Sequence, residues 1–241
     1  MIISRAGQQI EFNINKSEVI KYSTNDYDEQ LQRQFDWLQY FKDNPSIVNA
    51  KKIVKKDNKI SLIMDYIEGI PLHREIIESI NNQVFQKVES ALRILFHLHK
   101  SDSFFNKIDI NDIFEHYIKK TIDRYNTAKF FIPCLQKKYF LLNKVLINNP
   151  YLLIIKQQKE IANYLFNKCK TGIIHGDPNF SNIMWDISKK IPIFIDPRGL
   201  FGKHKLIGDI YYDLAKVLYS FDGFCDIIEK HGILNNFNTT S

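Results

Sequence analysis

Residues 173–196 read IIHGDPNFSNIMWDISKKIPIFID and carry the most informative pattern in the chain. The stretch begins with an apolar pair, turns sharply at residues 175–178 (HGDP), and passes through a polar segment to Asn182. It then enters an apolar, strand-like run at residues 191–195, which ends on an acid, Asp196. This order predicts two short strands with polar residues clustered at their ends.

The spacing of His175, Asp177 and Asn182 matches the kinase catalytic loop H-R-D-x-x-x-x-N, with Gly176 in place of arginine. A hydroxyl that attacks a γ-phosphate must lose its proton, and a carboxylate such as Asp177 accepts it. Magnesium prefers oxygen ligands, which the amide of Asn182 and the carboxylate of Asp196 would supply. Gly176 permits a tight turn that a Cβ would resist.

A surface hairpin is the alternative interpretation, since Asp, Asn, Pro and Ser are ordinary turn formers. However, chance placement of four such residue types at fixed positions is expected in fewer than about one chain in a hundred. The pattern therefore favours phosphoryl transfer.

The segments HGDPNFSNIM, FIDPRG and GDIYYDLAKVLYS resemble the aminoglycoside phosphotransferase and choline kinase superfamily of small-molecule kinases. The resemblance is specific over residues 171–220. It implies roles for five residues: Asp177 as general base, Asn182 and Asp196 as metal ligands, and His175 and Asp213 as structural supports of the loop. It also implies ATP, with GTP not excluded, and Mg²⁺ as cofactors.

A protein-kinase-like, two-lobed α+β fold follows from the same resemblance. We expect a small antiparallel-sheet lobe at residues 1–67, which binds nucleotide, and a mainly helical catalytic and acceptor-binding lobe at residues 68–241. A chain of 241 residues with 44% hydrophobic content is long enough to bury a core of this kind.

Residues 10–14 alternate apolar and polar side chains, and residues 19–22 (VIKY) form a second compact strand pattern. VIKY resembles the kinase motif V-A-I-K, which implies that Lys21 holds the α- and β-phosphates. A solvated lysine on a strand is the alternative. Only Gly7 precedes Lys21, so the chain lacks the glycine-rich phosphate loop of kinases.

A helix is expected from a cap at Asn25 or Asp26 to about residue 42. Its apolar face recurs at a helical period, and its inward polar residue is Gln34 rather than an acid. We therefore expect a hydrogen bond between Lys21 and Gln34 in place of the usual Lys–Glu ion pair of kinases. Further along the chain, residues 64–69 (MDYIEG) resemble the interlobe hinge of kinases. The resemblance implies that the backbone at Asp65, Tyr66 and Ile67 holds the adenine.

Further helices are predicted at residues 83–100, 110–126, 134–147 and 153–170. Aromatic residues are frequent between positions 117 and 140, where they suit either a core or cation–π contacts with a choline-like acceptor. These residues alone do not choose the acceptor. Asp209 is expected to cap the helix that carries Asp213.

Arg198 follows the proposed metal ligand by two residues and opens a local basic cluster. One hypothesis is that Arg198 and Lys205 meet an anion on the acceptor or the nucleotide. A structural arginine bonded to a carbonyl or an acid is an equal alternative, given its five donors.

The composition excludes several other classes of protein. The three cysteines are widely spaced, which indicates neither a disulfide framework nor a zinc site, and no apolar run is long enough to span a membrane. The start of the chain lacks signal-peptide features, so a cytoplasmic location is expected. The net charge of +6 is scattered along the chain, which makes nucleic-acid binding a weak hypothesis resting on charge alone.

The sequence thus predicts an ATP- and Mg²⁺-dependent kinase for a small-molecule hydroxyl acceptor. Amino alcohols, aminoglycosides and sugars all fit the superfamily. The sequence of residues 195–216 resembles bacterial sequences associated with surface-polysaccharide synthesis. This resemblance slightly favours a sugar or glycan precursor as the acceptor. A degenerate kinase fold that binds or regulates without catalysis is the alternative.

Overall fold

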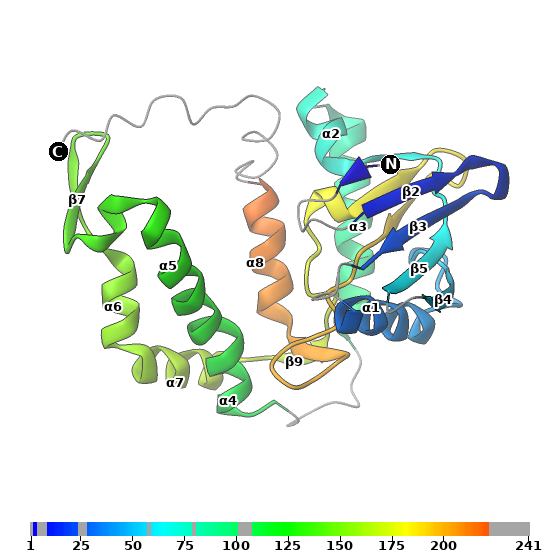
Figure 1. Cartoon of the computed structure of the whole chain (residues 1–241). Coiled ribbons are helices and arrows are strands. Elements are labelled where there is room, and N and C mark those ends of the chain that lie inside the picture. Colours follow the sequence, from blue (N-terminus) through cyan, green and yellow to red (C-terminus); the bar gives the residue numbers. More distant parts are fainter. Residues whose placement is uncertain are drawn as a thin grey trace.

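A computed structural model of the chain describes residues 2–3, 9–23, 28–56, 59–78, 81–100 and 108–221. Gly7 and the predicted helix caps Asn25 and Asp26 lie outside these residues. An antiparallel sheet comes first in the chain, and a mainly helical region follows it (Figure 1). The predicted α+β class is confirmed.

Five strands form the first sheet in the spatial order β1-β2-β3-β5-β4, and all neighbours are antiparallel. The strands are β1 (Ile2–Ile3), β2 (Gln9–Asn13), β3 (Glu18–Tyr22), β4 (Ala50–Lys56) and β5 (Lys59–Asp65). The strand predicted at residues 19–22 is confirmed as β3, the central strand. Lys21 on β3 lies opposite Leu62 of β5, which is fully buried, so the lysine side chain belongs to the covered face of the sheet.

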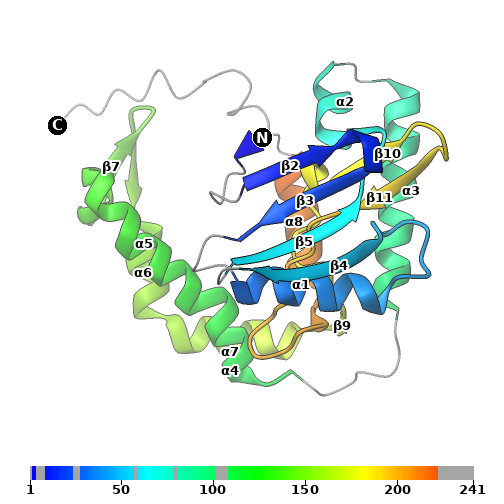
Figure 2. The same cartoon turned by 45° about the vertical axis from the view of Figure 1, so that its right-hand side comes forward.

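Helix α1 (Asp28–Tyr40) packs across that face against β4 and β5 (Figure 2). Leu31, Trp37 and Leu38 recur at a helical period and are all buried. Gln34 lies between them in sequence and is also buried. The same apolar stripe that docks the helix therefore brings Gln34 to the sheet face that carries Lys21.

The middle of the molecule consists of short strands between two long helices. After β6 (Gly69–Pro71) and α2 (Leu72–Glu78), helix α3 (Asn82–His99) confirms the helix predicted at residues 83–100. Asn81 caps α3 by accepting hydrogen bonds from two backbone N–H groups of its first turn. The remaining elements are β9 (Thr171–Ile173), β10 (Ile183–Asp186), β11 (Ile191–Phe194), β12 (Ile207–Asp209) and α8 (Ile210–Phe221).

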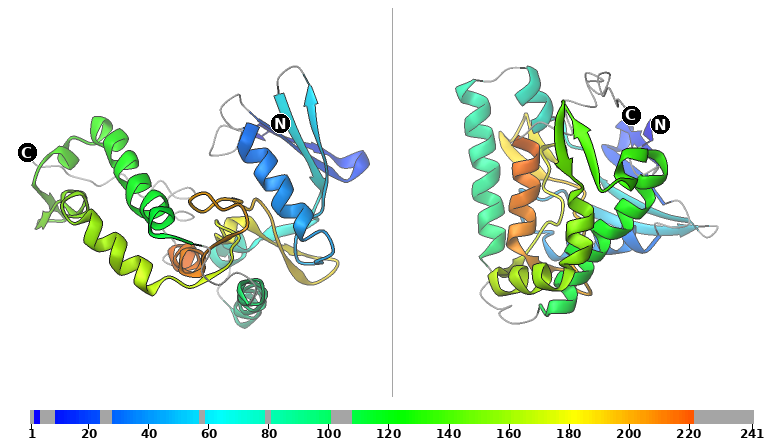
Figure 3. Two further views of the ribbon diagram at one scale, coloured as in Figure 1. Left: turned by 90° about the horizontal axis from the view of Figure 1, so that it is seen from below. Right: turned by 90° about the vertical axis from the view of Figure 1, so that its left-hand side faces the viewer.

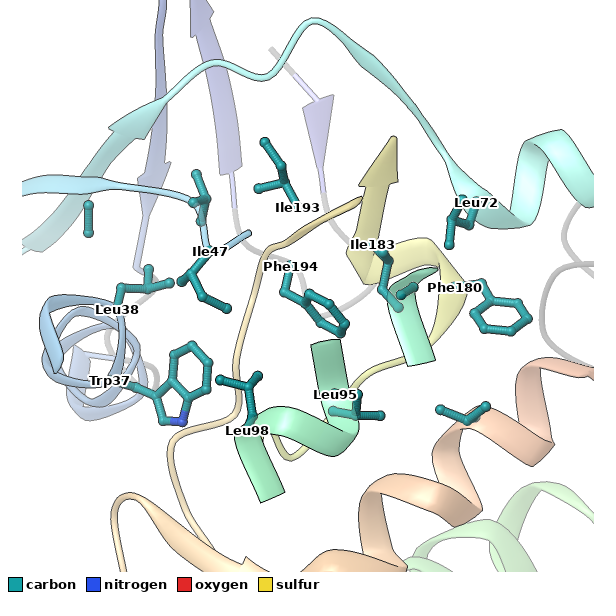
Figure 4. Close-up of a cluster of buried hydrophobic side chains, with 14 of the residues drawn as sticks. Trp37, Leu38, Ile47, Leu72, Leu95, Leu98, Phe180, Ile183, Ile193 and Phe194 are labelled. Atoms are coloured by element: carbon teal, nitrogen blue, oxygen red, sulfur yellow. The ribbon is translucent and has the colours of Figure 1, made fainter. Parts of the chain in front are cut away.

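The strands β11, β10 and β6 form a three-stranded antiparallel sheet, and β12 pairs with β9. Hydrophobic side chains from α1, α3, β10 and β11 pack into one core (Figure 4). Trp37 of α1 adds a polar link, because its Nε1 donates to the carbonyl oxygen of Ile174 at 2.9 Å. The core thus fixes α1 against the segment that follows β9.

A second group of helices lies on the far side of α8 from the five-stranded sheet (Figure 3). It contains α4 (Ile110–Ile113), the π-helical segment η4 (Phe114–Lys119), α5 (Lys120–Phe131), α6 (Pro150–Lys156) and α7 (Gln158–Lys168). The first three are continuous and extend the helix predicted at residues 110–126. Among the described residues, no helix is both long and apolar enough to cross a membrane.

The helix predicted at residues 134–147 is wrong. Residues 133–136 form a 3₁₀ turn, and a hairpin of β7 (Tyr139–Leu142) and β8 (Val145–Asn148) follows it. The two turn residues between the strands, Asn143 and Lys144, both have positive φ angles, of 50° and 67°. Such angles suit a tight hairpin turn, and the apolar run here satisfies either period, so β-propensity and turn geometry decide the outcome.

Candidate active site

The turn after β9 has a backbone that only glycine suits at Gly176. Its φ is +83°, in the left-handed region, and a Cβ built there would lie 2.7 Å from Cβ of Arg198. The carbonyl oxygen of His175 also accepts a hydrogen bond from the backbone N–H of Arg198 at 2.8 Å. The HGD segment and the segment after Asp196 are therefore packed backbone to backbone.

The side chain of Asp213 on α8 bonds to the backbone of this turn. Its carboxylate is fully buried and accepts from the backbone N–H groups of His175 and Gly176, each at 2.8 Å. His99 Nε2, at the end of α3, lies 3.1 Å from the same carboxylate. Charge-assisted bonds of this kind are stronger than neutral ones. These contacts would be the physical basis of the structural role predicted for Asp213.

His175 is fully buried beneath the turn, and its Nε2 lies 3.1 Å from the carbonyl oxygen of Ile195. Burial lowers the pKa of His175, although the nearby carboxylates of Asp213, Asp177 and Asp196 oppose the shift. The side chain therefore links the two strand ends as a neutral imidazole, consistent with a structural role.

Asp177 lies at the partly exposed tip of the turn. Its Oδ1 is 2.9 Å from Nζ of Lys216 on α8 and accepts from Nδ2 of Asn179 at 3.0 Å. Asn182 donates from Nδ2 to the carbonyl oxygen of Asp177 at 2.9 Å. Because its nitrogen is occupied, the amide oxygen of Asn182 is the atom that remains for a cation.

Asp196 follows β11 with a φ of +57° and faces the covered side of the first sheet. Its Oδ1 lies 2.6 Å from Nζ of Lys21 and also accepts a hydrogen bond from Nε2 of Gln34. Lys21 in turn donates to Oε1 of Gln34 at 3.2 Å, so the predicted Lys21–Gln34 hydrogen bond is confirmed. A kinase would have an acid at this helix position. In this chain the amide of Gln34 takes its place and bonds to both the ammonium group of Lys21 and the carboxylate of Asp196.

Desolvation by itself raises the pKa of Asp196, but the charge and hydrogen bond of Lys21 outweigh it and hold the pKa below its usual range. Asp196 is therefore ionised at neutral pH and can serve as an anionic ligand. Glu29, an acid in the first turn of α1, does not contact Lys21 and instead forms an exposed ion pair with Arg33 at 3.2 Å.

The predicted hinge residues lie at the end of β5, where Asp65 is its last residue and Tyr66 and Ile67 follow it. The backbone N–H groups of Asp65 and Tyr66 already donate to the carbonyl oxygens of Asn49 and Ser17, at 3.0 and 2.9 Å. The N–H of Ile67 donates to none of the described residues. Within the part of the chain that the structure describes, Ile67 is therefore the one of the three whose backbone N–H is available to a ligand.

Residues 19–231 match the model of the phosphotransferase enzyme family, APH. The chain belongs to this family. It is therefore a small-molecule phosphotransferase, which confirms the predicted superfamily and class of enzyme. No curated protein sequence matches the chain significantly.

Solved structures confirm the kinase-like fold of this APH family member. The aminoglycoside phosphotransferase APH(3'')-Id from Streptomyces rimosus, in complex with ADP and streptomycin, gives a TM-score of 0.62 at 16% identity, over 94% of this chain and 82% of that one. A second structure of that protein gives 0.63 at 17% identity, over 95% and 82%. The gentamicin complex of APH(2'')-IIa gives 0.50 at 17% identity, over 86% and 64%. These identities establish the fold alone.

Arg198 and Lys205 of this APH family member have different partners, and Lys205 forms an ion pair with Asp36 at 3.6 Å. Arg198 instead donates from Nη1 to the hydroxyl of Tyr212 at 3.2 Å. Lys120, at the start of α5, donates to the same hydroxyl at 2.8 Å.

Four of the residues around the loop were not identified from the sequence. Lys216 had a usable signal, because it lies one helical turn after Asp213 and so shares its face of α8. Lys120, Tyr212 and His99 had none, since their contacts join helices that are far apart in the chain.

Proposed function

We propose that this phosphotransferase moves the γ-phosphate of ATP to a hydroxyl group of a small molecule in the presence of Mg²⁺. The contacts of four side chains support the proposal. Lys21 pairs with Asp196, which is 175 positions away, at 2.6 Å. Asn182 bonds to Asp177, and its carbonyl oxygen accepts from the backbone N–H of Ile195, the residue before Asp196. A sugar or glycan precursor is the preferred acceptor. The lobes proposed are residues 1–67 and 68–241, and the nucleotide would lie between them, with its adenine at the hinge.

The roles proposed follow from the contacts. Lys21 would hold the nucleotide phosphates, and Gln34 would position Lys21 and Asp196. Asp177 would accept the proton of the acceptor hydroxyl, because its carboxylate lies at the partly exposed tip of the turn, where Nζ of Lys216 lies 2.9 Å from its Oδ1. His175 and Asp213 would fix the turn through buried hydrogen bonds.

The side chains present fit magnesium. Asp196 supplies a carboxylate that is ionised at neutral pH, and Asn182 supplies an amide oxygen whose partner nitrogen is anchored. Magnesium is commonly bound by one or two such groups together with phosphate oxygens and water. A bound Mg²⁺ would neutralise charge that develops on the phosphates during transfer.

A second candidate function is binding or regulation without catalysis. One observation favours it: Lys21 is paired directly with Asp196, and Gln34 stands where a kinase has its acid. In that case the cation of Lys21 would fill the place of the metal rather than hold phosphate.

The test is phosphoryl transfer itself. Purified protein is incubated with ATP, Mg²⁺ and a panel of neutral, acidic and phosphorylated sugars, amino sugars and amino alcohols, and phosphorylated product is detected by mass spectrometry. The proposal predicts a product with at least one acceptor class that disappears in Asp177→Asn, although this variant still binds ADP. Retention of ADP binding with no product from any acceptor, or an Asp177→Asn variant as active as wild type, would favour the second candidate.

A further inference from the structure

Three cationic side chains converge around one aromatic residue beside the proposed general base. The hydroxyl of Tyr212 accepts from Lys120 at 2.8 Å and from Arg198 at 3.2 Å. The Nζ atoms of Lys120 and Lys216 lie over the Tyr212 ring, 5.1 and 5.8 Å from its centroid. Lys216 also reaches Asp177 at 2.9 Å, so the cluster is continuous with the tip of the catalytic turn.

The charge of this cluster is not balanced. Among the described residues, neither Lys120 nor Arg198 has a carboxylate within 4.0 Å, and Lys216 has only that of Asp177. The neutral hydroxyl of Tyr212 is a shared hydrogen-bond acceptor and does not compensate two positive charges. Cations that are partly withdrawn from water are normally paired.

The same imbalance acts on the neighbouring ionisable groups. Burial, and then the charges of Arg198, Arg124 and Lys216, lower the pKa of Lys120 to about 7, with Asp177 opposing them. Burial and four cations lower the pKa of His116 to about 3. These cations are Lys120, Arg198, Lys216 and Arg124.

The buried side chain of His116 is a second observation beside this cluster. It packs edge-on against Tyr212, with ring centroids 4.5 Å apart, and is 8% exposed. Its buried Nε2 has no hydrogen-bond partner among the described residues. Most buried polar atoms in native proteins have a partner, which makes an unpartnered one unusual.

We infer that the acceptor carries an anionic group, a carboxylate or a phosphate, which Lys120 and Arg198 bind while its hydroxyl faces Asp177. This inference rests on the proposed function and names the class of its acceptor. An arginine fork and an ammonium group together match the oxygens of such an anion. Cationic acceptors, such as amino alcohols and aminoglycosides, are repelled by the same cluster, so the acceptor is an acidic or phosphorylated sugar rather than an amino sugar.

Another anion, the γ-phosphate of the nucleotide, is the competing occupant. The two differ in what a variant changes. If the cluster held the nucleotide, replacing Lys120 would weaken the binding of ADP or ATP. If it holds the acceptor, replacing Lys120 would leave nucleotide binding unchanged and would weaken only the binding of acceptor-like ligands that carry a negative charge.

The experiment uses the full chain saturated with ADP and Mg²⁺, so that nucleotide binding is measured first and separately. Sodium sulfate is then titrated against sodium chloride at equal ionic strength, followed by glucuronate, glucose and glucosamine, which share a hexose ring but differ in charge. Binding is followed by calorimetry and thermal shift. Wild type is compared with Lys120→Gln, and with Lys119→Gln. Lys119 is an exposed lysine one position earlier that forms a surface ion pair with Glu115.

We expect sulfate and glucuronate to bind wild type more tightly than glucose, and glucosamine to bind most weakly. Lys120→Gln should raise the Kd of both anions about tenfold, as expected for one charge-assisted hydrogen bond. Its ADP affinity should stay unchanged, and Lys119→Gln should behave as wild type. Without ligand, Lys120→Gln should melt no lower than wild type, because an uncompensated charge has been removed.

Two results would overturn the inference while leaving the proposed function intact: ADP binding with no preference for anions over glucose, or an anion preference that Lys120→Gln retains. A Lys120→Gln variant that loses ADP affinity assigns the cluster to the nucleotide and also overturns it. Absence of ADP binding in wild type would remove the proposed function, and the inference about the acceptor with it.

Discussion

Asp213 offers the sharpest test of how the turn at residues 175–178 is held. The substitution Asp213→Asn keeps the shape of the side chain but replaces one carboxylate oxygen with an NH₂ group. The two oxygens accept from the backbone N–H groups of His175 and Gly176, each at 2.8 Å, inside a fully buried site. One of these N–H groups would therefore face a donor and lose its partner.

The expected cost follows from those contacts. A hydrogen bond to a charged group contributes about 1.5–3 kcal/mol, and an unsatisfied buried donor costs about 1–3 kcal/mol. The lost contribution of the bond and the penalty for the unsatisfied N–H overlap, because both arise from the same broken hydrogen bond, so they are not added in full. We expect the free energy of unfolding to fall by roughly 3 kcal/mol. In a domain of this size, such a change lowers Tm by about 6–12 °C.

Urea denaturation followed by tryptophan fluorescence is the assay. Trp37 is a suitable reporter, because it is buried, donates to Ile174 and packs edge-on against His175 at 5.5 Å between ring centroids. The matched control is Asp123→Asn, an exposed acid on α5. If Asp213→Asn changed the free energy of unfolding by less than about 0.5 kcal/mol, the usual effect of a surface substitution, the bonding described for the turn would be refuted.

Three further predictions concern the neighbouring residues. Gly176→Ala should destabilise the fold by at least about 1–2 kcal/mol in urea denaturation, because of its positive φ and the close approach of Arg198; an unchanged midpoint would contradict this. Gln34→Glu should lower the free energy of unfolding by roughly 1–3 kcal/mol at neutral pH, because it replaces the hydrogen-bond donor to Asp196 with a second anion. A variant more stable than wild type would contradict this and show that Lys21 is better paired with an acid at position 34. In wild type, sulfate affinity in the presence of ADP should fall between pH 6 and pH 8, as Lys120 loses its proton near pH 7, while Lys120→Arg should abolish that dependence. The charged groups whose fields act on Lys120 are Arg198, Arg124, Lys216 and Asp177, and titration of sulfate itself does not interfere in this range.

The sequence was most informative where chemistry is carried by fixed spacing along the chain. The H-G-D-x-x-x-x-N pattern placed Asp177 and Asn182 on one turn, and a short strand later brought Asp196 beside it. The bond between Lys21 and Gln34 was also predictable, because helix α1 has a single inward polar residue at the right position on its apolar face. Local periodicity is sufficient for such predictions.

Two features lay beyond the sequence for different physical reasons. The hairpin of β7 and β8 has an apolar run that suits a helix or a strand, and the choice depends on two residues with positive φ. The cationic cluster joins Lys120 to Tyr212 across 92 positions, so it depends on how α5 packs near α8. No local pattern encodes a contact of that kind.

The central claim is that Asp196 and Lys21 form a magnesium–nucleotide site, and calorimetric titration of ADP tests it most directly. ADP is titrated with and without Mg²⁺ into wild type and Asp196→Asn. We expect Mg²⁺ to tighten ADP binding to wild type by about tenfold or more, and Asp196→Asn to lose this dependence but keep weak, metal-independent binding. Equal ADP affinity with and without Mg²⁺ in wild type, or an unchanged magnesium effect in Asp196→Asn, would contradict it.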